Sequence, residues 1–265
     1  MLVSAKSLQE VRFGERQAGL SQEEWQTRVE LAAVYRLVHH YGWTSQVYNQ
    51  ITARIPGTEH VLINAFGLAY DEIRASNLVK IDLDGNKVGD SPYPVNAAGF
   101  TIHSAVHAAR SDVACVAHTH SPNATALAAL RIDFVPLAQE GYQFYGRVAY
   151  HEFEGIALDL EERERLVRDL GRDKHTMVLR NHGLLVMGES IVWAFVRLYQ
   201  FEVAAGIQLR AMATGQPLSI PPEAVMLRTR EQFEGGAAQA GAMVRHPEWP
   251  AELRKLDRID PSWRT

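Results

Sequence analysis

Residues 113–120 read VACVAHTH, an apolar run that ends in two histidines. Such a run is typical of a buried strand near the centre of a sheet. Because side chains two residues apart on a strand point to the same face, His118 and His120 can present two imidazoles to one point. A third histidine, His182, lies between two further apolar runs and would complete the half-cage that a divalent metal needs. On spacing alone, the plainer alternative of exposed or structurally buried histidines stays open.

The neighbouring residues place these histidines at strand ends. Ser121 and Pro122 predict the start of a helix, in which Ser121 accepts from free backbone N–H groups and Pro122 occupies the first turn. The tripeptide Asn-His-Gly at 181–183 predicts a tight turn between two strands. We expect Gly183 to adopt a positive φ there and His182 to project from the tip of a hairpin. Binding sites are commonly built where strands end and the chain changes direction.

The rest of the chain mixes helices and short strands without regular βαβ alternation. This pattern favours a predominantly antiparallel or mixed sheet sandwiched by helices. We divide the chain into an N-terminal arm over 1–20, a domain over 21–215, and a C-terminal arm with short helices over 216–265. The expected elements are a helix between a Ser21 cap and Gly42, short strands between 45 and 87 with a turn at Asp84-Gly85, a helix over 97–110, an acidic helix over 158–170 and a long helix over 190–212.

A second histidine pair, His103 and His107, lies four residues apart on the helix expected over 97–110. Two histidines at this spacing share one helix face and bind metal in the zincin motif, but the acid that the motif places between them is absent. We therefore expect packing or supporting roles for this pair.

Bulk composition excludes several classes of function. The chain has 265 residues, 46% of them hydrophobic, and a formal net charge of −4 without a basic block. This argues against a nucleic-acid or membrane-surface role. Cys115 is the only cysteine, so no intrachain disulfide can form and a reducing compartment is favoured. We see neither a signal peptide nor a membrane span and expect a cytoplasmic protein.

Several segments together resemble the class II aldolase/adducin family over about residues 22–215. The resemblance implies a three-layer α/β/α domain with a central, mainly antiparallel sheet, usually a homotetramer with sites at subunit interfaces. It also implies a divalent metal, Zn²⁺ in the aldolases, held by three histidines that match His118, His120 and His182. Fe(II) or Mn(II) would also suit such a site. The segments that carry the resemblance are GWTS at 42–45 with Tyr48-Asn49, FGLAY at 66–70, VNAAGFTIHS at 95–104, VAHTH at 116–120 and LRNHG at 179–183.

The chain departs from the sugar-phosphate aldolases at one place. Those enzymes carry a Pro-Ser-Ser-Glu-like stretch with an acid/base glutamate, whereas this chain reads Asn-Ala-Ala-Gly over 96–99 and resembles the adducin-like branch. Three neutral imidazoles without a carboxylate leave the metal with its full +2 charge, which favours an anionic oxygen ligand. Gly99 either leaves room beside the metal for a substrate group or water, or merely lets the helix pack closely.

Glu140 is the acid that we expect to replace the missing glutamate, as a base or as a fourth ligand. The resemblance places it near the site, although an exposed loop glutamate is an equal alternative. Asn49 and the backbone at Gly67 match the anion-holding loops of the family and would grip a carboxylate, unless both serve only as turn residues.

These observations predict a metal-dependent lyase that acts on a small oxygenated carboxylate or hydroxy-carbonyl substrate. The reaction would be aldol-type C–C cleavage or decarboxylation through an enolate, where negative charge develops. Two alternatives stay open: a non-catalytic adducin-like assembly module and a three-histidine Fe(II) oxygenase. The adducin head is not regarded as an enzyme, and the missing glutamate favours that reading. A metal analysis distinguishes chemistry from scaffolding.

Overall fold

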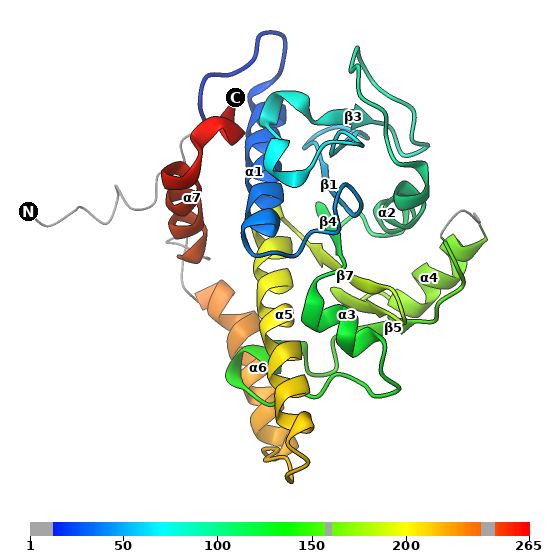
Figure 1. Ribbon diagram of the computed structural model, residues 1–265, viewed down its shortest axis with the longest axis vertical. Coiled ribbons are helices and arrows are strands. Elements are labelled where there is room, and N and C mark those ends of the chain that lie inside the picture. The colour runs from blue at the N-terminus through cyan, green and yellow to red at the C-terminus, as the bar shows by residue number, and fades with distance from the viewer. Residues whose placement is uncertain (1–12, 157–160, 240–246) are drawn as a thin grey trace, which may run out of the picture.

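A seven-stranded sheet forms the middle layer of the structure, a computed structural model that describes residues 13–156, 161–239 and 247–265 (Figure 1). The strand order is β3-β2-β1-β4-β7-β6-β5, and neighbours pair antiparallel except β5 and β6, which are parallel. This confirms the expected mainly antiparallel sheet. The strands are β1 (Gln50–Arg54), β2 (Val61–Ile63), β3 (Val79–Ile81), β4 (Cys115–Thr119), β5 (Val148–His151), β6 (Thr176–Leu179) and β7 (Gly183–Gly188).

Helices cover both faces of the sheet. Figure 1 shows α1 and α5 along one side of the sheet and α2 and α4 along the other. The α-helices are α1 (Gln22–His40), α2 (Ala97–Ala109), α3 (Pro122–Ala128), α4 (Glu162–Leu170), α5 (Ile191–Ala213), α6 (Glu223–Gln239) and α7 (Glu248–Ile259). Short 3₁₀ helices are η2 (Tyr70–Glu72), η3 (Ala75–Asn77), η4 (Gln139–Phe144) and η5 (Pro261–Arg264).

The central strand β4 divides its side chains between two hydrophobic clusters. Cys115 and Ala117 pack with α1 and α5, whereas Val116 packs with α2 and α4. Successive strand residues point to opposite faces, so each face of β4 is buried under its own helical layer. This alternation explains the apolar run in the sequence and confirms the three-layer α/β/α fold. It also directs His118, two residues after Val116, toward the α2 side.

The predicted cap and one buried tyrosine fix α1 over the sheet. Ser21 Oγ accepts a hydrogen bond from the backbone N–H of Glu24 at 3.1 Å, as the sequence predicts. The hydroxyl of Tyr35, on α1, accepts from the backbone N–H groups of Ile51 at 2.8 Å and Asn64 at 3.1 Å. Because the same hydroxyl contacts both β1 and the end of β2, it fixes the start of β1, where Asn49 and Gln50 lie.

The C-terminal segment differs from the expected arm with short helices. Helix α6 has 17 residues and packs against η4, which in turn packs against α5. Helix α7 lies against α1, and its Trp249 and Leu253 belong to the same core cluster as α1 and α5. This segment is therefore packed onto the domain.

Two expectations fall partly outside the described residues. Of the N-terminal arm over 1–20, residues 1–12 are not described, whereas the carbonyl of Phe13 accepts from Trp25 Nε1 at 2.9 Å. The acidic helix expected from residue 158 is described from Glu162 onward as α4. Within the described parts of the chain, no helix has the length and apolar character that crossing a membrane requires.

Candidate metal centre

The structure brings together the three histidines that the sequence singles out. His118 is on β4, His120 follows the strand, and His182 comes from the turn between β6 and β7. One ligand atom from each lies within 4.8 Å of the others, and His118 Nε2 is 3.2 Å from His120 Nε2. Among the described residues this is the only cluster of at least three His, Cys, Asp or Glu side chains with this geometry.

Strand pairing and one glycine produce this convergence. Thr119 pairs with Leu184, so β7 begins beside the end of β4. A Cβ added at Gly183 would lie 2.6 Å from the carbonyl oxygen of Thr119 and 2.9 Å from Cδ2 of His120. The expected positive φ at Gly183 is wrong, since Asn181 takes it with φ 55°. Glycine is needed at 183 because the two strands and the imidazole approach closely there.

The environment keeps the three imidazoles neutral. Burial, and then the neighbouring imidazoles of His182 and His120, lower the pKa of His118 well below its usual value. Burial also lowers the pKa of His182 to about 4 and lowers the pKa of His120. His118 Nδ1 donates to the carbonyl of Leu184 at 3.0 Å, which leaves its Nε2 facing the other histidines. Neutral imidazoles with free ring nitrogens are the form that binds a metal.

Asn49 lies beside the cluster in a conformation that leaves one buried donor unused. Its φ is 76°, and its Oδ1 accepts from the backbone N–H of His120 at 3.4 Å. Its Nδ2 is buried and has no hydrogen-bond partner in the described part of the chain. Buried polar atoms are nearly always paired, so this orphaned amide fits a site that receives a further oxygen ligand. Three neutral imidazoles and this donor fit a divalent cation with an oxygen-bearing ligand.

Gly67 occupies an exposed turn with φ 99°, a conformation that favours glycine. The preceding Phe66 places its ring 6.3 Å from that of Tyr48, so this turn borders the Asn49 loop.

At Gly99 the structure supports close packing rather than vacant room. A Cβ at this position would overlap Oε1, Cδ and Nε2 of Gln50, which is on β1. The space that a side chain at position 99 would enter is therefore occupied by the amide of Gln50. Sequence reasoning missed Gln50, because a polar residue at a strand start gives no local signal of this contact.

Glu140 is not part of the histidine cluster within one chain. It is exposed on η4, and η4 packs against α5 and α6. Its carboxylate is therefore accessible to another molecule and is not among the side chains of the histidine cluster.

His103 and His107 have the packing role that the missing acid of the zincin motif favours. Both are buried on α2, and Thr52 Oγ1 on β1 lies 2.8 Å from His103 Nδ1 and 2.8 Å from His107 Nε2. The pair thus ties α2 to the sheet near the histidine cluster.

A buried glutamate that the sequence reading missed orders the chain just after the histidines. The carboxylate of Glu202, on α5, accepts from Ser121 Oγ at 2.7 Å and from the backbone N–H groups of Asn123 and Ala124 at 2.8 Å and 2.9 Å. Ser121 is the N-cap residue of α3 and Pro122 opens the helix, as expected, but the hydroxyl of Ser121 donates to Glu202 instead of accepting from backbone N–H groups. The sequence did carry one signal of this contact, because Glu202 is a lone acid on the largely apolar face of α5.

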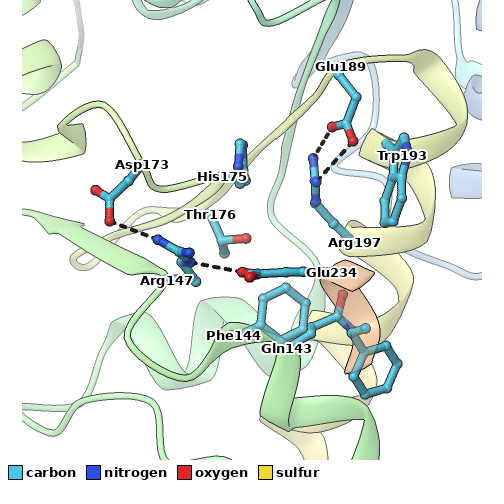
Figure 2. Close-up of a pocket in the computed structure, with 11 residues that line it drawn as sticks. Gln143, Phe144, Arg147, Asp173, His175, Thr176, Glu189, Trp193, Arg197 and Glu234 are labelled. Atoms are coloured by element: carbon cyan, nitrogen blue, oxygen red, sulfur yellow. Dashed lines mark hydrogen bonds and ion pairs between the residues drawn. The ribbon is translucent and has the colours of Figure 1, made fainter. Parts of the chain in front are cut away.

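A separate cavity of about 390 Å³ lies at the opposite end of the β6–β7 hairpin, lined partly by Thr176 and Glu189 (Figure 2). Arg147 in this cavity bridges Asp173 and Glu234 at 3.0 Å and 3.1 Å. Arg197 pairs with Glu189 at 2.7 Å, as Figure 2 shows. These opposite charges neutralise one another within the lining, so the cavity does not present a free cationic site.

The layered fold and the histidine cluster at its strand ends define a class II aldolase-type domain. The sequence profile of the Class II Aldolase and Adducin N-terminal domain matches residues 29–209. The chain belongs to this family.

Solved structures and curated relatives agree with this assignment. An aldolase II superfamily protein from Pseudomonas syringae is 47% identical with a TM-score of 0.85, over 93% of this chain and 98% of that chain. L-fuculose 1-phosphate aldolase from Glaciozyma antarctica PI12 is 27% identical with a TM-score of 0.79, over 96% and 98% of the two chains. Alpha-adducin of Rattus norvegicus is 38% identical over 243 residues, which are 88% of this chain and 33% of alpha-adducin.

Proposed function

We propose that the protein is a metal-dependent lyase that cleaves a C–C bond in a small oxygenated carboxylate or hydroxy-carbonyl compound. The reaction is aldol-type cleavage or decarboxylation through an enolate. The observation that carries the proposal is the convergence of three neutral imidazoles within 4.8 Å, beside an unpaired buried amide of Asn49. The similarity to an L-fuculose 1-phosphate aldolase supports the reaction class.

Each residue of the centre has a distinct task in this proposal. His118, His120 and His182 hold a divalent cation, which we take to be Zn²⁺. A bound cation would supply positive charge that stabilises negative charge on a substrate oxygen. Asn49 Nδ2 donates to a second substrate oxygen and orients the substrate against the histidines. No described carboxylate joins the cluster, so the full positive charge is available to an anionic substrate.

The acid/base is assigned to a neighbouring subunit. Glu140 is exposed and outside the cluster of its own chain, so it reaches a metal centre only across an interface. We therefore propose a cytoplasmic homotetramer in which Glu140 of one subunit serves the site of the next.

The second candidate is a non-catalytic assembly module. The 38% identity to alpha-adducin and the glycine at position 99 favour it. A third reading, an Fe(II) oxygenase, uses the same three histidines with a different metal.

Metal analysis of the purified protein tests the proposal. We expect one divalent ion per chain, lost in His118→Ala and in His182→Ala. The control His39→Ala changes an exposed histidine at the end of α1 and should keep the metal. Turnover is then screened with 2-oxo and hydroxy acids on the Zn²⁺, Fe²⁺ and Mn²⁺ forms. A wild-type protein without affinity for any of these ions supports the assembly module, and turnover that requires oxygen supports the oxygenase.

A further inference from the structure

We infer that Gln50 is a substrate-binding residue of the candidate metal centre, whose uncharged amide occupies the space where a side chain at residue 99 would begin. The inference rests on the proposed function and names the substrate class: a carboxylate with a carbonyl or hydroxyl oxygen on the adjacent carbon.

Strand register places Gln50 beside the first histidine. Gln50 on β1 is the antiparallel partner of His118 on β4. Side chains of directly opposite residues share one face, with Cβ atoms about 4.5–5.5 Å apart. Thr52, two residues after Gln50, contacts the histidines of α2. Gln50 and His118 therefore both point to the α2 side of the sheet.

The start of α2 holds the amide of Gln50 in place. Gln50 is 3% exposed, and its amide lies where a Cβ of residue 99 would be. The amide thus fills the gap between the first turn of α2 and the strand that carries His118. An amide offers two donors and an acceptor and is costly to bury unless they are used.

Two consecutive amides then flank the three histidines. Asn49 contacts the backbone of His120 and keeps a buried Nδ2 free, and Gln50 lies opposite His118. Both can donate to oxygen without adding charge, so the cation keeps its attraction for an anion. Gln50 can also accept from a hydroxyl. Two oxygen-directed donors around one cation match the adjacent oxygens of a 2-oxo or 2-hydroxy carboxylate.

Oxalate binding to the Co²⁺-loaded protein tests the inference, since the visible spectrum of Co²⁺ reports both metal binding and oxalate binding. The variant Gln50→Leu removes the amide at similar size. The variant Gly99→Ala adds a Cβ that displaces the amide without changing Gln50. Gln200→Leu on α5 is the control for loss of a partly buried glutamine far from this pairing.

We expect Gln50→Leu and Gly99→Ala to bind Co²⁺ within about twofold of the wild type and oxalate about tenfold more weakly, the effect of one hydrogen bond. Gln50→Glu should bind Co²⁺ more tightly and oxalate about a hundredfold more weakly, because its carboxylate repels the anion. The control should match the wild type in both. Thermal unfolding of each Co²⁺-loaded protein verifies that the variant is folded. Oxalate binding by any one folded Gln50 or Gly99 variant is enough to test the inference.

The failures are distinguishable. If the wild type binds Co²⁺ and oxalate but the folded variants bind oxalate equally well, Gln50 only fills space and the inference is wrong. If the wild type does not bind Co²⁺, the proposed function fails first and the inference with it.

Discussion

His182 reaches the other two histidines because the residue after it has no side chain. At Gly183 the backbone of β7 approaches the carbonyl of Thr119 so closely that a Cβ would lie 2.6 Å from that oxygen. The obstacle is backbone in the middle of the sheet, which cannot rotate away as a side chain can. The identity of one residue therefore controls both the β4–β7 pairing and the position of the third imidazole.

Gly183→Ala should lower the free energy of unfolding by about 1–3 kcal/mol, the usual cost of overpacking, and weaken Zn²⁺ binding at least tenfold. Urea unfolding of the metal-free protein and calorimetric Zn²⁺ titration measure the two effects. Gly235→Ala on α6 is the matched control, because a Cβ there meets nothing within 4 Å. Equal behaviour of both variants would contradict the close-approach argument.

At the scale of elements, the carboxylate of Glu202 orders the start of α3. It accepts from two free N–H groups of the first turn and from the hydroxyl of Ser121. The N-terminus of a helix is a favourable place for negative charge. Since α3 begins two residues after His120, this contact also fixes the chain that leaves the histidine cluster. Helix α5 thus supports the site through the position of α3.

Glu202→Gln should destabilise the protein by about 2–4 kcal/mol, because an amide nitrogen then faces backbone donors in a buried place. Chemical denaturation measures the loss. Glu231→Gln changes an exposed glutamate on α6 and should be nearly neutral. A loss in Glu202→Gln no larger than in this control would mean that the buried carboxylate contributes little.

Local patterns predicted much of this arrangement, and long-range contacts account for what they missed. The apolar runs around His118 and His182 fixed the strands, and the turn at 181–183 joined the third histidine to them. The cap position of Ser121 follows from its neighbours, but the partner of its hydroxyl, Glu202, is 81 residues away. Gln50 meets Gly99 only because β1 pairs with β4 under α2. No periodic pattern or motif spacing in the sequence marks either contact, so neither could be predicted from neighbouring residues.

At the scale of the whole molecule, neutral histidines hold the α2 layer on the sheet. Burial lowers the pKa of His103 and of His107 to about 3, well below the value of about 6.5 in an unfolded chain. Below pH 6.5 the unfolded chain therefore binds more protons than the folded one. The contribution of these two histidines to stability is fully present above pH 6.5 and is lost as the pH falls toward 3.

We expect the free energy of unfolding of the metal-free protein to fall between pH 6.5 and pH 4 by up to about 1.4 kcal/mol per pH unit for each of these histidines. Denaturant unfolding at several pH values measures the slope. The double variant His103→Gln/His107→Gln removes both titrations and should show a shallower slope than the wild type. An identical slope would assign the acid sensitivity to other groups.

Cys115 is a fully buried residue of β4, and its side chain belongs to the hydrophobic cluster on the α1 side of the sheet. Burial raises the pKa of its thiol. It is also the only cysteine of the chain. A thiol-reactive dye can therefore label the native protein only when the central strand opens, and the rate of labelling reports how often the strand opens. Because the same strand carries His118, loading the protein with Zn²⁺ should slow the labelling of Cys115.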